Sequence, residues 1–374
     1  MNYLFITCPY GFEPLLQKEL TTLGIEKISL GFCGVKIPYT VENVFLANYE
    51  SRIATRVLLP LAEFPCSGKE ELYKRCKKLP WNDFLSCDKT FAVDANVQHP
   101  TLKNSLFAAL VVKDAICDFF RDQTGMRPNV DIKRPDVQLN LFIQQGRAIL
   151  YFDTSGTPLH KRGWRVDSVP ATLHESLAAA LLLLKGYHAE QILCDPFCGS
   201  GTFLIEAGWI ATRTPPGFLR KRWGFFHLPN FQLSRWQAWK KQRDERIIPL
   251  AKGVIVGSDQ SRETTEACKK NLQKAGLLSS IEISYDPIAY YNPKVTPNLL
   301  MTNPPYGKRI DSSPLLFEQI QTFIQEKCAP HTQAHILCAN AHLIEAITLP
   351  KTAEFAFKNG GLPVTLHSFV SEGS

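Results

Sequence analysis

Short apolar runs, several of them ending in a turn residue or an acid, recur through the second half of the chain. Their length suits buried strands, and the longer stretches between them can hold helices. We expect seven strands, over residues 191–194, 254–258, 281–285, 298–302, 335–339, 354–357 and 364–369. The last two flank Asn359-Gly360-Gly361, which is typical of a hairpin. The pattern predicts an α/β domain with a seven-stranded, Rossmann-like sheet over residues 172–374, opened by an apolar helix at 172–184.

The first part of the chain has a different pattern, with strands and helices in mixed order. Residues 1–66 predict a small α+β unit and residues 67–158 a second one. The expected strands cover residues 3–8, 35–37, 53–64, 90–97, 137–144 and 147–152. The expected helices cover residues 13–23, 41–49, 69–78 and 105–120. Neither unit holds a cluster of catalytic acids, so both are expected to serve binding.

A glycine-containing turn follows the first strand of the second half. Its sequence is Asp195-Pro196-Phe197-Cys198-Gly199-Ser200-Gly201-Thr202, and a helix-like run follows at residues 203–207. The glycines let a ligand approach the backbone, and a helix N-terminus favours a carboxylate or phosphate. The turn lacks the third glycine of the dinucleotide fingerprint and the Gly-Lys-Ser/Thr ending of a P-loop.

Two acids end the next two expected strands. Asp259 can accept both hydroxyls of a ribose, and Asp286 can accept a hydrogen bond from an adenine amine. Because ligands bind at the carboxyl ends of parallel strands, both acids are expected near the glycine turn.

The fourth strand is followed by Asn303-Pro304-Pro305-Tyr306. Two prolines fix φ and remove two backbone donors, so the loop is stiff and offers free carbonyls. Asn303 Oδ1 and the Pro304 carbonyl can accept the two hydrogens of a planar amine, while Tyr306 covers the ring. A proline turn that merely ends a strand, with Tyr306 as packing, explains the same residues.

Taken together, these motifs resemble those of AdoMet-dependent amino-methyltransferases. Further segments resemble the N-terminal half of bacterial THUMP-domain guanine-N2 methyltransferases that act on large-subunit ribosomal RNA. These segments are residues 7–11, 51–58, 113–116, 127–131, 153–156 and His160-Lys161-Arg162-Gly163-Trp164-Arg165. The resemblance covers nearly the whole chain and implies a class I methyltransferase domain preceded by ferredoxin-like and THUMP units.

The resemblance also implies the roles of individual residues. Asn303, Pro304, Pro305 and Tyr306 would hold and stack the target base of an RNA, with AdoMet as the methyl donor. The cofactor would contact Glu175, Asp195, Pro196, Phe197, Cys198, Gly199, Gly201, Thr202, Asp259, Asp286 and Asn303. Three alternatives stay open: a transfer-RNA guanine-N2 enzyme, an adenine-N6 methyltransferase sharing the Asn-Pro-Pro-Tyr loop, and a non-catalytic RNA-binding assembly factor.

The formal net charge of +7 is mild, but it is unevenly distributed. Residues 213–246, an expected insertion, interleave many cations with seven aromatic residues, which suits looped or single-stranded RNA. A packed insertion with a solvated charged face explains the same pattern. The basic linker 159–171 could track phosphates, or could be a solvated connector. The candidate RNA-binding residues are Lys161, Arg162, Arg165, Arg220, Lys221 and Arg222.

The remaining composition is that of an ordinary globular protein, with 45% hydrophobic and 21% charged residues. No apolar run has the length of a membrane span, and the start lacks the basic region of a secretory signal. The 11 cysteines include no Cys-x-x-Cys pair, so we expect free thiols in a reducing cytoplasm. His331 and His335 lack the glutamate of a His-Glu-x-x-His site, so no metal is expected.

Overall fold

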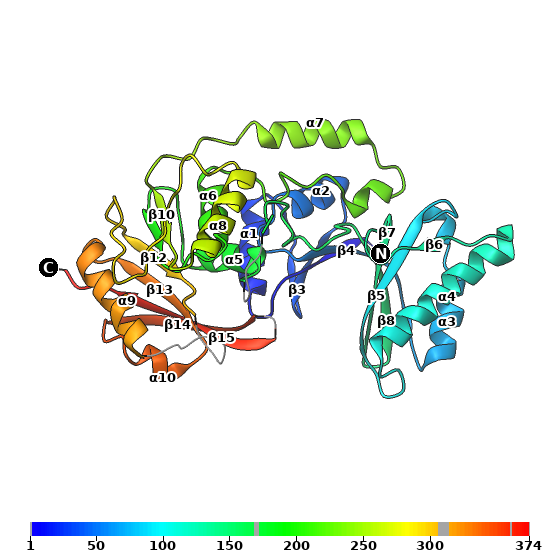
Figure 1. The fold of residues 1–374 in the computed structure, drawn as a ribbon. Helices are drawn as coiled ribbons and strands as arrows, with labels where there is room; N and C mark the ends of the chain where they lie inside the picture. The colour runs from blue at the N-terminus through cyan, green and yellow to red at the C-terminus, as the bar shows by residue number, and fades with distance from the viewer. Residues whose placement is uncertain (1, 168–171, 306–313, 360, 374) are drawn as a thin grey trace. The chain divides into compact units, whose positions relative to one another are not determined.

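The computed structural model describes residues 2–167, 172–305, 314–359 and 361–373. The chain divides into two compact units (Figure 1). The N-terminal unit comprises Met1–Cys8, Phe12–Leu159 and Arg220–Lys241. The C-terminal unit comprises Pro9–Gly11, His160–Leu219 and Gln242–Ser374. Residues 220–241, although they lie within the expected methyltransferase region, therefore pack with the N-terminal unit.

One eight-stranded sheet runs through the N-terminal unit, in the order β2-β3-β1-β4-β8-β7-β5-β6. The strands are β1 Tyr3–Thr7, β2 Ser29–Gly31, β3 Gly34–Pro38, β4 Arg56–Pro65, β5 Thr90–Gln98, β6 Asn129–Val130, β7 Val137–Gln144 and β8 Arg147–Asp153. The long strand β4 pairs antiparallel with β1 on one side and with β8 on the other. The two small units expected from the sequence therefore share a continuous sheet.

Four helices complete these two halves: α1 Glu13–Thr22, α2 Val41–Tyr49, α3 Lys69–Lys77 and α4 Ser105–Thr124. Local capping explains two of the boundaries. Thr40 accepts a hydrogen bond from the Asn43 N–H at the start of α2, at 3.0 Å. Gly125, with φ of +73°, ends α4, which is one turn longer than expected. In Figure 1, α3 and α4 lie side by side next to β5.

The C-terminal unit holds a seven-stranded sheet in the order β11-β10-β9-β12-β13-β15-β14. The strands are β9 Leu193–Asp195, β10 Ile255–Ser258, β11 Glu282–Ser284, β12 Leu299–Thr302, β13 Gln333–Cys338, β14 Lys351–Asn359 and β15 Leu362–Val370. The first five are parallel, while β15 is antiparallel to both β13 and β14. All seven expected strands and the closing hairpin are thus confirmed.

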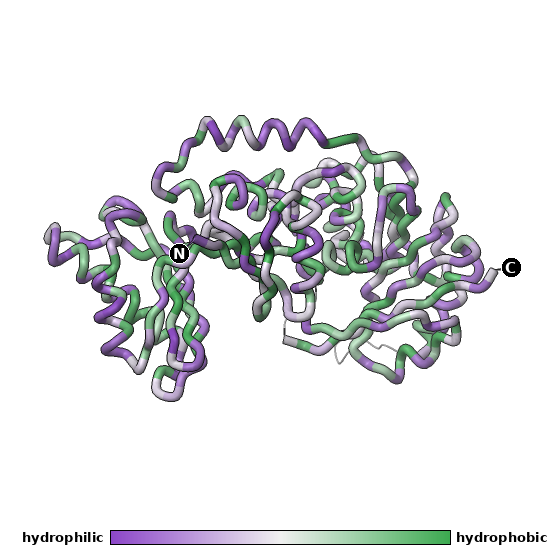
Figure 2. The backbone as a smooth tube through the Cα atoms, turned by 180° about the vertical axis from the view of Figure 1, so that it is seen from behind, coloured by the Kyte–Doolittle hydropathy of each residue, from purple (hydrophilic) through white to green (hydrophobic). Residues whose placement is uncertain are grey.

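Helices cover both faces of this sheet (Figure 1). One face carries α5 Glu175–Leu184, α6 Thr202–Ala211 and α8 Arg262–Ala275; the other carries α9 Pro314–Lys327 and α10 Ala341–Ile344. The core under α9 is fully buried, with Phe317, Ile320 and Ile324 packed against Leu300 and Ile336 of the strands. Figure 2 shows α7, Leu233–Asp244, as a mostly hydrophilic helix in contrast to these apolar strands.

Candidate functional site

The motif residues meet at one edge of the C-terminal sheet. Strand β9 pairs in parallel with β10 on one side and with β12 on the other. The strand order therefore reverses at β9, since β10 and β11 extend the sheet to one side and β12 and β13 to the other. Ligands of open α/β sheets bind at such a switch point, beyond the carboxyl ends of the strands. The loops that follow β9, β10, β11 and β12 are the ones that carry the predicted cofactor and amine contacts.

The turn after β9 contains two glycines in the left-handed region, which favours this residue. Gly199 and Gly201 have φ of +53° and +85°, and Gly201 is the N-cap of α6. A Cβ on Gly201 would lie 2.7 Å from Cys268 Sγ, so a side chain there would force Cys268 of α8 or the turn itself to shift. The turn presents bare backbone at the N-terminus of a buried helix, an environment that binds carboxylates and phosphates.

Asp259, one residue beyond β10, is bonded to this turn. Its Oδ2 accepts a hydrogen bond from the Gly199 N–H at 3.1 Å, and its Oδ1 accepts one from Ser261 N–H at 2.9 Å. Burial raises the pKa of Asp259, and the two N–H donors act in the opposite direction. The sequence-predicted ribose acceptor and the glycine turn are therefore in direct contact.

Asp286 lies two residues beyond β11, held by serines of the neighbouring strands. Ser258 Oγ donates to the Asp286 carbonyl at 2.7 Å, and Ser284 Oγ donates to the Asp286 carboxylate. These bonds place a half-buried carboxylate next to the end of β10, as the expected adenine contact requires.

Asp195 joins the ends of β9 and β12. Its Oδ1 accepts hydrogen bonds from Thr302 Oγ1 at 2.7 Å and from Phe197 N–H at 3.1 Å. Burial raises the pKa of Asp195 to about 7, with a smaller contribution from the charge of Asp259, while the two donors oppose the shift. Asp195 thereby fixes Thr302, the residue that directly precedes Asn303. The pattern of the sequence gave no indication of this role for Thr302.

Asn303 carries the chemical feature that stands out most at this edge. Its Oδ1 is buried and accepts no hydrogen bond from the described residues. A buried carbonyl oxygen without a donor costs about 1–3 kcal/mol, so such an atom calls for a ligand. The adjacent Pro304 is also buried. Tyr306, the expected stacking residue, lies outside the described residues.

The connector before α5 is bound to this same site. Arg165 Nε donates to Glu175 Oε1 at 2.8 Å, and its Nη1 and Nη2 donate to Ser200 Oγ at 2.7 Å and Thr202 Oγ1 at 3.1 Å. Asn271 of α8 accepts the Val166 and Asp167 N–H groups and donates to the Ser200 carbonyl. These bonds make residues 160–167 part of the C-terminal unit rather than a solvated linker.

Arg162 and Arg165, two of the expected RNA-binding residues in the connector, bind acidic side chains of the protein itself. Arg162 is 1% exposed and forms an ion pair with Glu206, which is fully buried on α6. Trp164, also fully buried, points its Nε1 at the same carboxylate, 3.4 Å away. The burial of Arg162 and the bonds of Arg165 argue against the expected contact with phosphates. From the sequence alone, an arginine that pairs with a buried acid looks the same as an arginine that binds a phosphate.

Arg220 requires the same correction. Its guanidinium is buried and donates to the carbonyls of Ser155, Thr157 and Pro158, at 2.8–3.0 Å. Its Cζ lies 4.5 Å from the centre of the Trp223 ring. Arg220 thus holds the return of the chain after β8 and is not available to RNA.

The aromatic residues of the insertion form a packed cluster. Trp223, Phe225 and Trp236 are at most 4% exposed. The Trp236 ring lies 5.0 Å from Phe45 and 5.4 Å from Tyr49, both on α2. These three rings therefore attach the insertion to the N-terminal unit instead of offering stacking surfaces for bases, whereas Phe218 is exposed.

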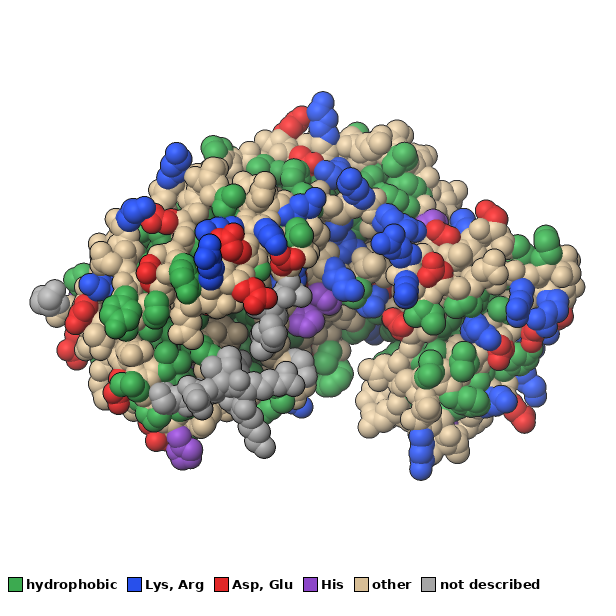
Figure 3. Space-filling view, viewed as in Figure 1, with side chains coloured by type: hydrophobic (Ala, Val, Ile, Leu, Met, Phe, Trp, Pro, Cys, Tyr) green, Lys and Arg blue, Asp and Glu red, His purple; other side chains and the backbone are tan. Residues whose placement is uncertain are grey.

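Lys161, Lys221 and Arg222 are exposed, as an RNA contact would require, although Arg222 also lies 3.4 Å from Asp136. On the face shown in Figure 3, Lys and Arg side chains are interspersed with Asp and Glu. This face therefore agrees with the mild net charge, and Lys161, Lys221 and Arg222 remain candidates for contacts with RNA.

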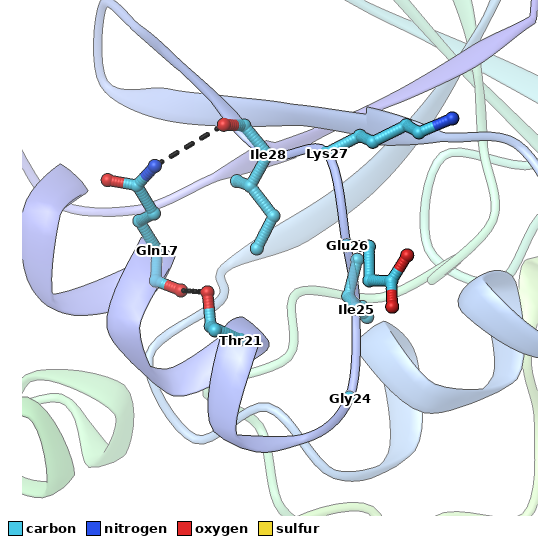
Figure 4. Close-up of a pocket in the computed structure, with 7 residues that line it drawn as sticks. All are labelled: Gln17, Thr21, Gly24, Ile25, Glu26, Lys27 and Ile28. Atoms are coloured by element: carbon cyan, nitrogen blue, oxygen red, sulfur yellow. Dashed lines mark hydrogen bonds between the residues drawn. The ribbon is translucent and has the colours of Figure 1, made fainter.

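A separate cleft of about 460 Å³ lies at the end of α1 in the N-terminal unit (Figure 4). Gln17 Nε2 donates to the Ile28 carbonyl across it, at 3.3 Å. None of the motif residues lines this cleft. Within the described ranges, no helix is long and apolar enough to cross a membrane, and no group of three metal-ligating side chains occurs. All 11 cysteines are free.

Three protein families match consecutive parts of the chain. Residues 3–58 match the RlmL ferredoxin-like domain, residues 66–153 the THUMP domain, and residues 162–368 the family described as RMKL-like, methyltransferase domain. These matches confirm the expected family and the expected fold class, with ferredoxin-like and THUMP units before a methyltransferase domain.

Curated relatives cover the whole length of the chain. A putative RNA methyltransferase of Synechocystis sp., slr0064, is 34% identical over 97% of this chain and 95% of its own length. The ribosomal RNA large subunit methyltransferase K/L of Syntrophotalea carbinolica is 35% identical over 98% of this chain. The chain spans about half the length of the K/L relatives, 53% in this case.

Two solved structures share the fold over nearly the whole chain. SMU.472, a putative methyltransferase complexed with SAH, is 25% identical, with a TM-score of 0.87 over 100% of this chain and 99% of its own. A predicted N6-adenine-specific DNA methylase from Listeria monocytogenes is also 25% identical, with a TM-score of 0.84 over 99% of this chain and 96% of its own.

Proposed function

Because the chain belongs to the RMKL-like methyltransferase family, we propose that it transfers a methyl group from AdoMet to the exocyclic N2 amine of a guanosine in RNA. Large-subunit ribosomal RNA is the substrate that we favour, since relatives that match 98% of the chain are named for it. The buried Asn303 Oδ1, which accepts no hydrogen bond from the described residues, is the observation that carries the proposal, because an amine hydrogen could serve as its donor.

The residues of the C-terminal unit fit AdoMet. The glycine turn and the N-terminus of α6 suit its methionine end, Asp259 its ribose, and Asp286 its adenine amine. When bound, AdoMet supplies an electrophilic methyl group on a sulfonium. The fit is supported by SMU.472, which has the same fold and was crystallised with SAH.

The loop after β12 would position the amine. Asn303 Oδ1 and the Pro304 carbonyl accept its two hydrogens, which favours a more tetrahedral nitrogen and points its lone pair at the methyl group. Free guanine N2 is a weak nucleophile because its lone pair is delocalised into the ring, so positioning is the main task of the site. The base must leave its stack to reach this loop, and Tyr306 is the ring proposed to cover it.

The N-terminal unit favours RNA over DNA. A THUMP match occupies residues 66–153, and two curated relatives that cover 97% and 98% of the chain are named as RNA methyltransferases. The Listeria protein is named as a DNA methylase, and adenine N6 is an exocyclic amine that the same loop could hold. The eleven free thiols agree with a reducing cytoplasm, where ribosomal RNA is made.

Transfer of labelled methyl groups from AdoMet would test the proposal. Unmodified large-subunit ribosomal RNA, transfer RNA and DNA are offered separately, and the products are digested to nucleosides. We expect N2-methylguanosine from ribosomal RNA. The same nucleoside from transfer RNA alone would show that transfer RNA, and not ribosomal RNA, is the substrate. N6-methyladenine in DNA would overturn the assignment to RNA. No label in any of the three nucleic acids would refute the activity.

Asn303→Ala tests the catalytic assignment. The variant should bind SAH as the parent does and lose most of kcat, by roughly 100-fold or more, because positioned acceptors act on the reacting nitrogen. Asn298→Ala is a matched control at the other end of β12, where Asn298 Oδ1 accepts the Ile192 N–H at 2.8 Å. Equal activity of the two variants would remove Asn303 from the reaction.

A further inference from the structure

Arg165 forms four hydrogen bonds around the glycine turn, and a role in RNA binding does not explain them. Besides its bonds to Glu175, Ser200 and Thr202, its Nη2 lies 3.4 Å from the Leu173 carbonyl. The guanidinium thus connects the first residue of α5 to both residues that flank Gly201 at the start of α6. We infer that Arg165 binds the carboxylate of the methionine end of AdoMet, an inference that rests on the proposed function.

The positive charges at this turn suit a carboxylate. The N-termini of α5 and α6 each carry about half a positive charge. Arg165 adds one positive charge, and Glu175, itself 5% exposed, adds one negative charge. The Asp259 carboxylate, which accepts the Gly199 N–H, adds a second negative charge and brings these charges close to balance, so Arg165 and the helix N-termini form the positive side of the turn, which prefers a carboxylate. A cation that merely fastened the connector would be better placed away from these helix ends.

The guanidinium retains a donor for such a ligand. It has five N–H groups, and its four hydrogen bonds use one on Nε, one on Nη1 and two on Nη2. The second N–H of Nη1 has no partner among the described residues, and the side chain is 18% exposed. Because Nη1 also donates to Ser200 Oγ, this second N–H lies beside the glycine turn.

Contacts within the protein fix the position of Arg165. Its Cζ lies 4.6 Å from the centre of the buried Trp164 ring, and the next two residues are bonded to Asn271. A preorganised guanidinium loses little conformational freedom when it takes up a carboxylate. Glu175 stands beside it, so the pair forms a clamp for a zwitterion: Arg165 for the carboxylate and Glu175 for the ammonium group.

Binding of SAH and of its decarboxylated analogue, measured by calorimetry, tests the inference. The parent protein should bind SAH about 10- to 100-fold more tightly than the analogue, the effect of one charge-assisted contact. In Arg165→Gln this preference should fall about 10-fold or more through a loss of SAH affinity, and what remains is the share of the helix N-termini. Arg165→Lys should recover part of the lost affinity, since it keeps the charge but not the fork.

Lys270→Ala is the matched control. It also removes one positive charge and breaks a contact to the connector, the 2.8 Å pair with Asp167, but this pair is exposed. The control should bind SAH as the parent does. If Arg165→Gln weakens both ligands equally, Arg165 only supports the fold of the turn, and the inference is wrong.

Should Arg165→Gln fail to fold, the parent protein alone can still refute the inference. Equal affinity for SAH and the decarboxylated analogue would overturn the role of Arg165 without touching methyl transfer. Absence of any SAH binding would instead refute the proposed function itself. Tight SAH binding without methylation of RNA would leave the carboxylate contact standing and remove only the substrate assignment.

Discussion

Thr302→Val tests whether Asp195 positions the catalytic loop. Thr302 is fully buried at the end of β12, and its hydroxyl donates to Asp195 Oδ1 at 2.7 Å. Valine has nearly the same shape and removes only the hydroxyl. The substitution therefore cuts the bond between the ends of β9 and β12 while leaving the packing of the strand intact.

The structure sets the size of the effect. Asp195 keeps its bond from the Phe197 N–H, so the lost interaction is one hydrogen bond to a carboxylate, worth about 1.5–3 kcal/mol of unfolding free energy. Because Asn303 is the next residue, release of Thr302 allows the amine acceptor to shift. A displacement of about 1 Å in a reacting group can cost on the order of 100-fold in rate. We expect kcat to fall about 10- to 100-fold.

Thr332→Val is the control for a general loss of stability. Thr332 is fully buried in the same unit, and its hydroxyl donates to the carbonyls of Ala329 at 2.6 Å and Pro297 at 3.2 Å. Urea unfolding should show similar losses for both variants, while methyl transfer to RNA should fall only in Thr302→Val. If both variants, still folded at the assay temperature, transfer methyl groups equally well, the positioning role of Asp195 is refuted.

Two further outcomes follow from burial. The pKa of Asp195 near 7 lies above the value of about 3.9 for an unfolded chain, so its proton stabilises the folded state below about pH 4, and this contribution is lost as the pH rises through about 7. Urea unfolding should therefore show that the parent loses about 2–3 kcal/mol of unfolding free energy between pH 5 and pH 7, a loss that Asp195→Asn lacks. An equal change in the two proteins would mean that the pKa of Asp195 is not raised. Trp236→Ala should cost about 3–5 kcal/mol of unfolding free energy, while Gln237→Ala, on the exposed side of α7, should cost almost none. Unchanged stability of Trp236→Ala together with weaker RNA binding would restore the base-stacking interpretation.

The sequence was sufficient to locate the site because the chemistry lies at strand ends. Apolar runs of strand length place the glycine turn, Asp259, Asp286 and Asn303 at the carboxyl edge of one parallel sheet, and the structure brings them there. Each motif is local, so neither the strand order nor the register had to be known. The motif positions therefore survive small errors in element boundaries, such as β14 beginning three residues early.

The features that the sequence did not reveal depend on contacts between distant segments. Nothing in the pattern of β4 indicates that it pairs with β1 and β8 at once. The burial of Trp236 against α2 likewise depends on residues almost 200 positions apart. Alternating cations and rings describe both a packed insertion and an RNA-binding surface, and only the identity of the neighbours separates the two.

The arginines of the connector show how this ambiguity is decided physically. A fully buried carboxylate such as Glu206 is tolerable only with a partner, because desolvation of an unpaired charge costs several kcal/mol. Arg162 supplies that partner, and Arg165 does the same for Glu175. An acid in the apolar face of a helix therefore predicts a buried cation elsewhere in the chain. Glu206, within the apolar run of α6, and Glu175, at the head of α5, are such acids, and counting them before assigning cations to RNA would have paired two arginines with acids of the same unit.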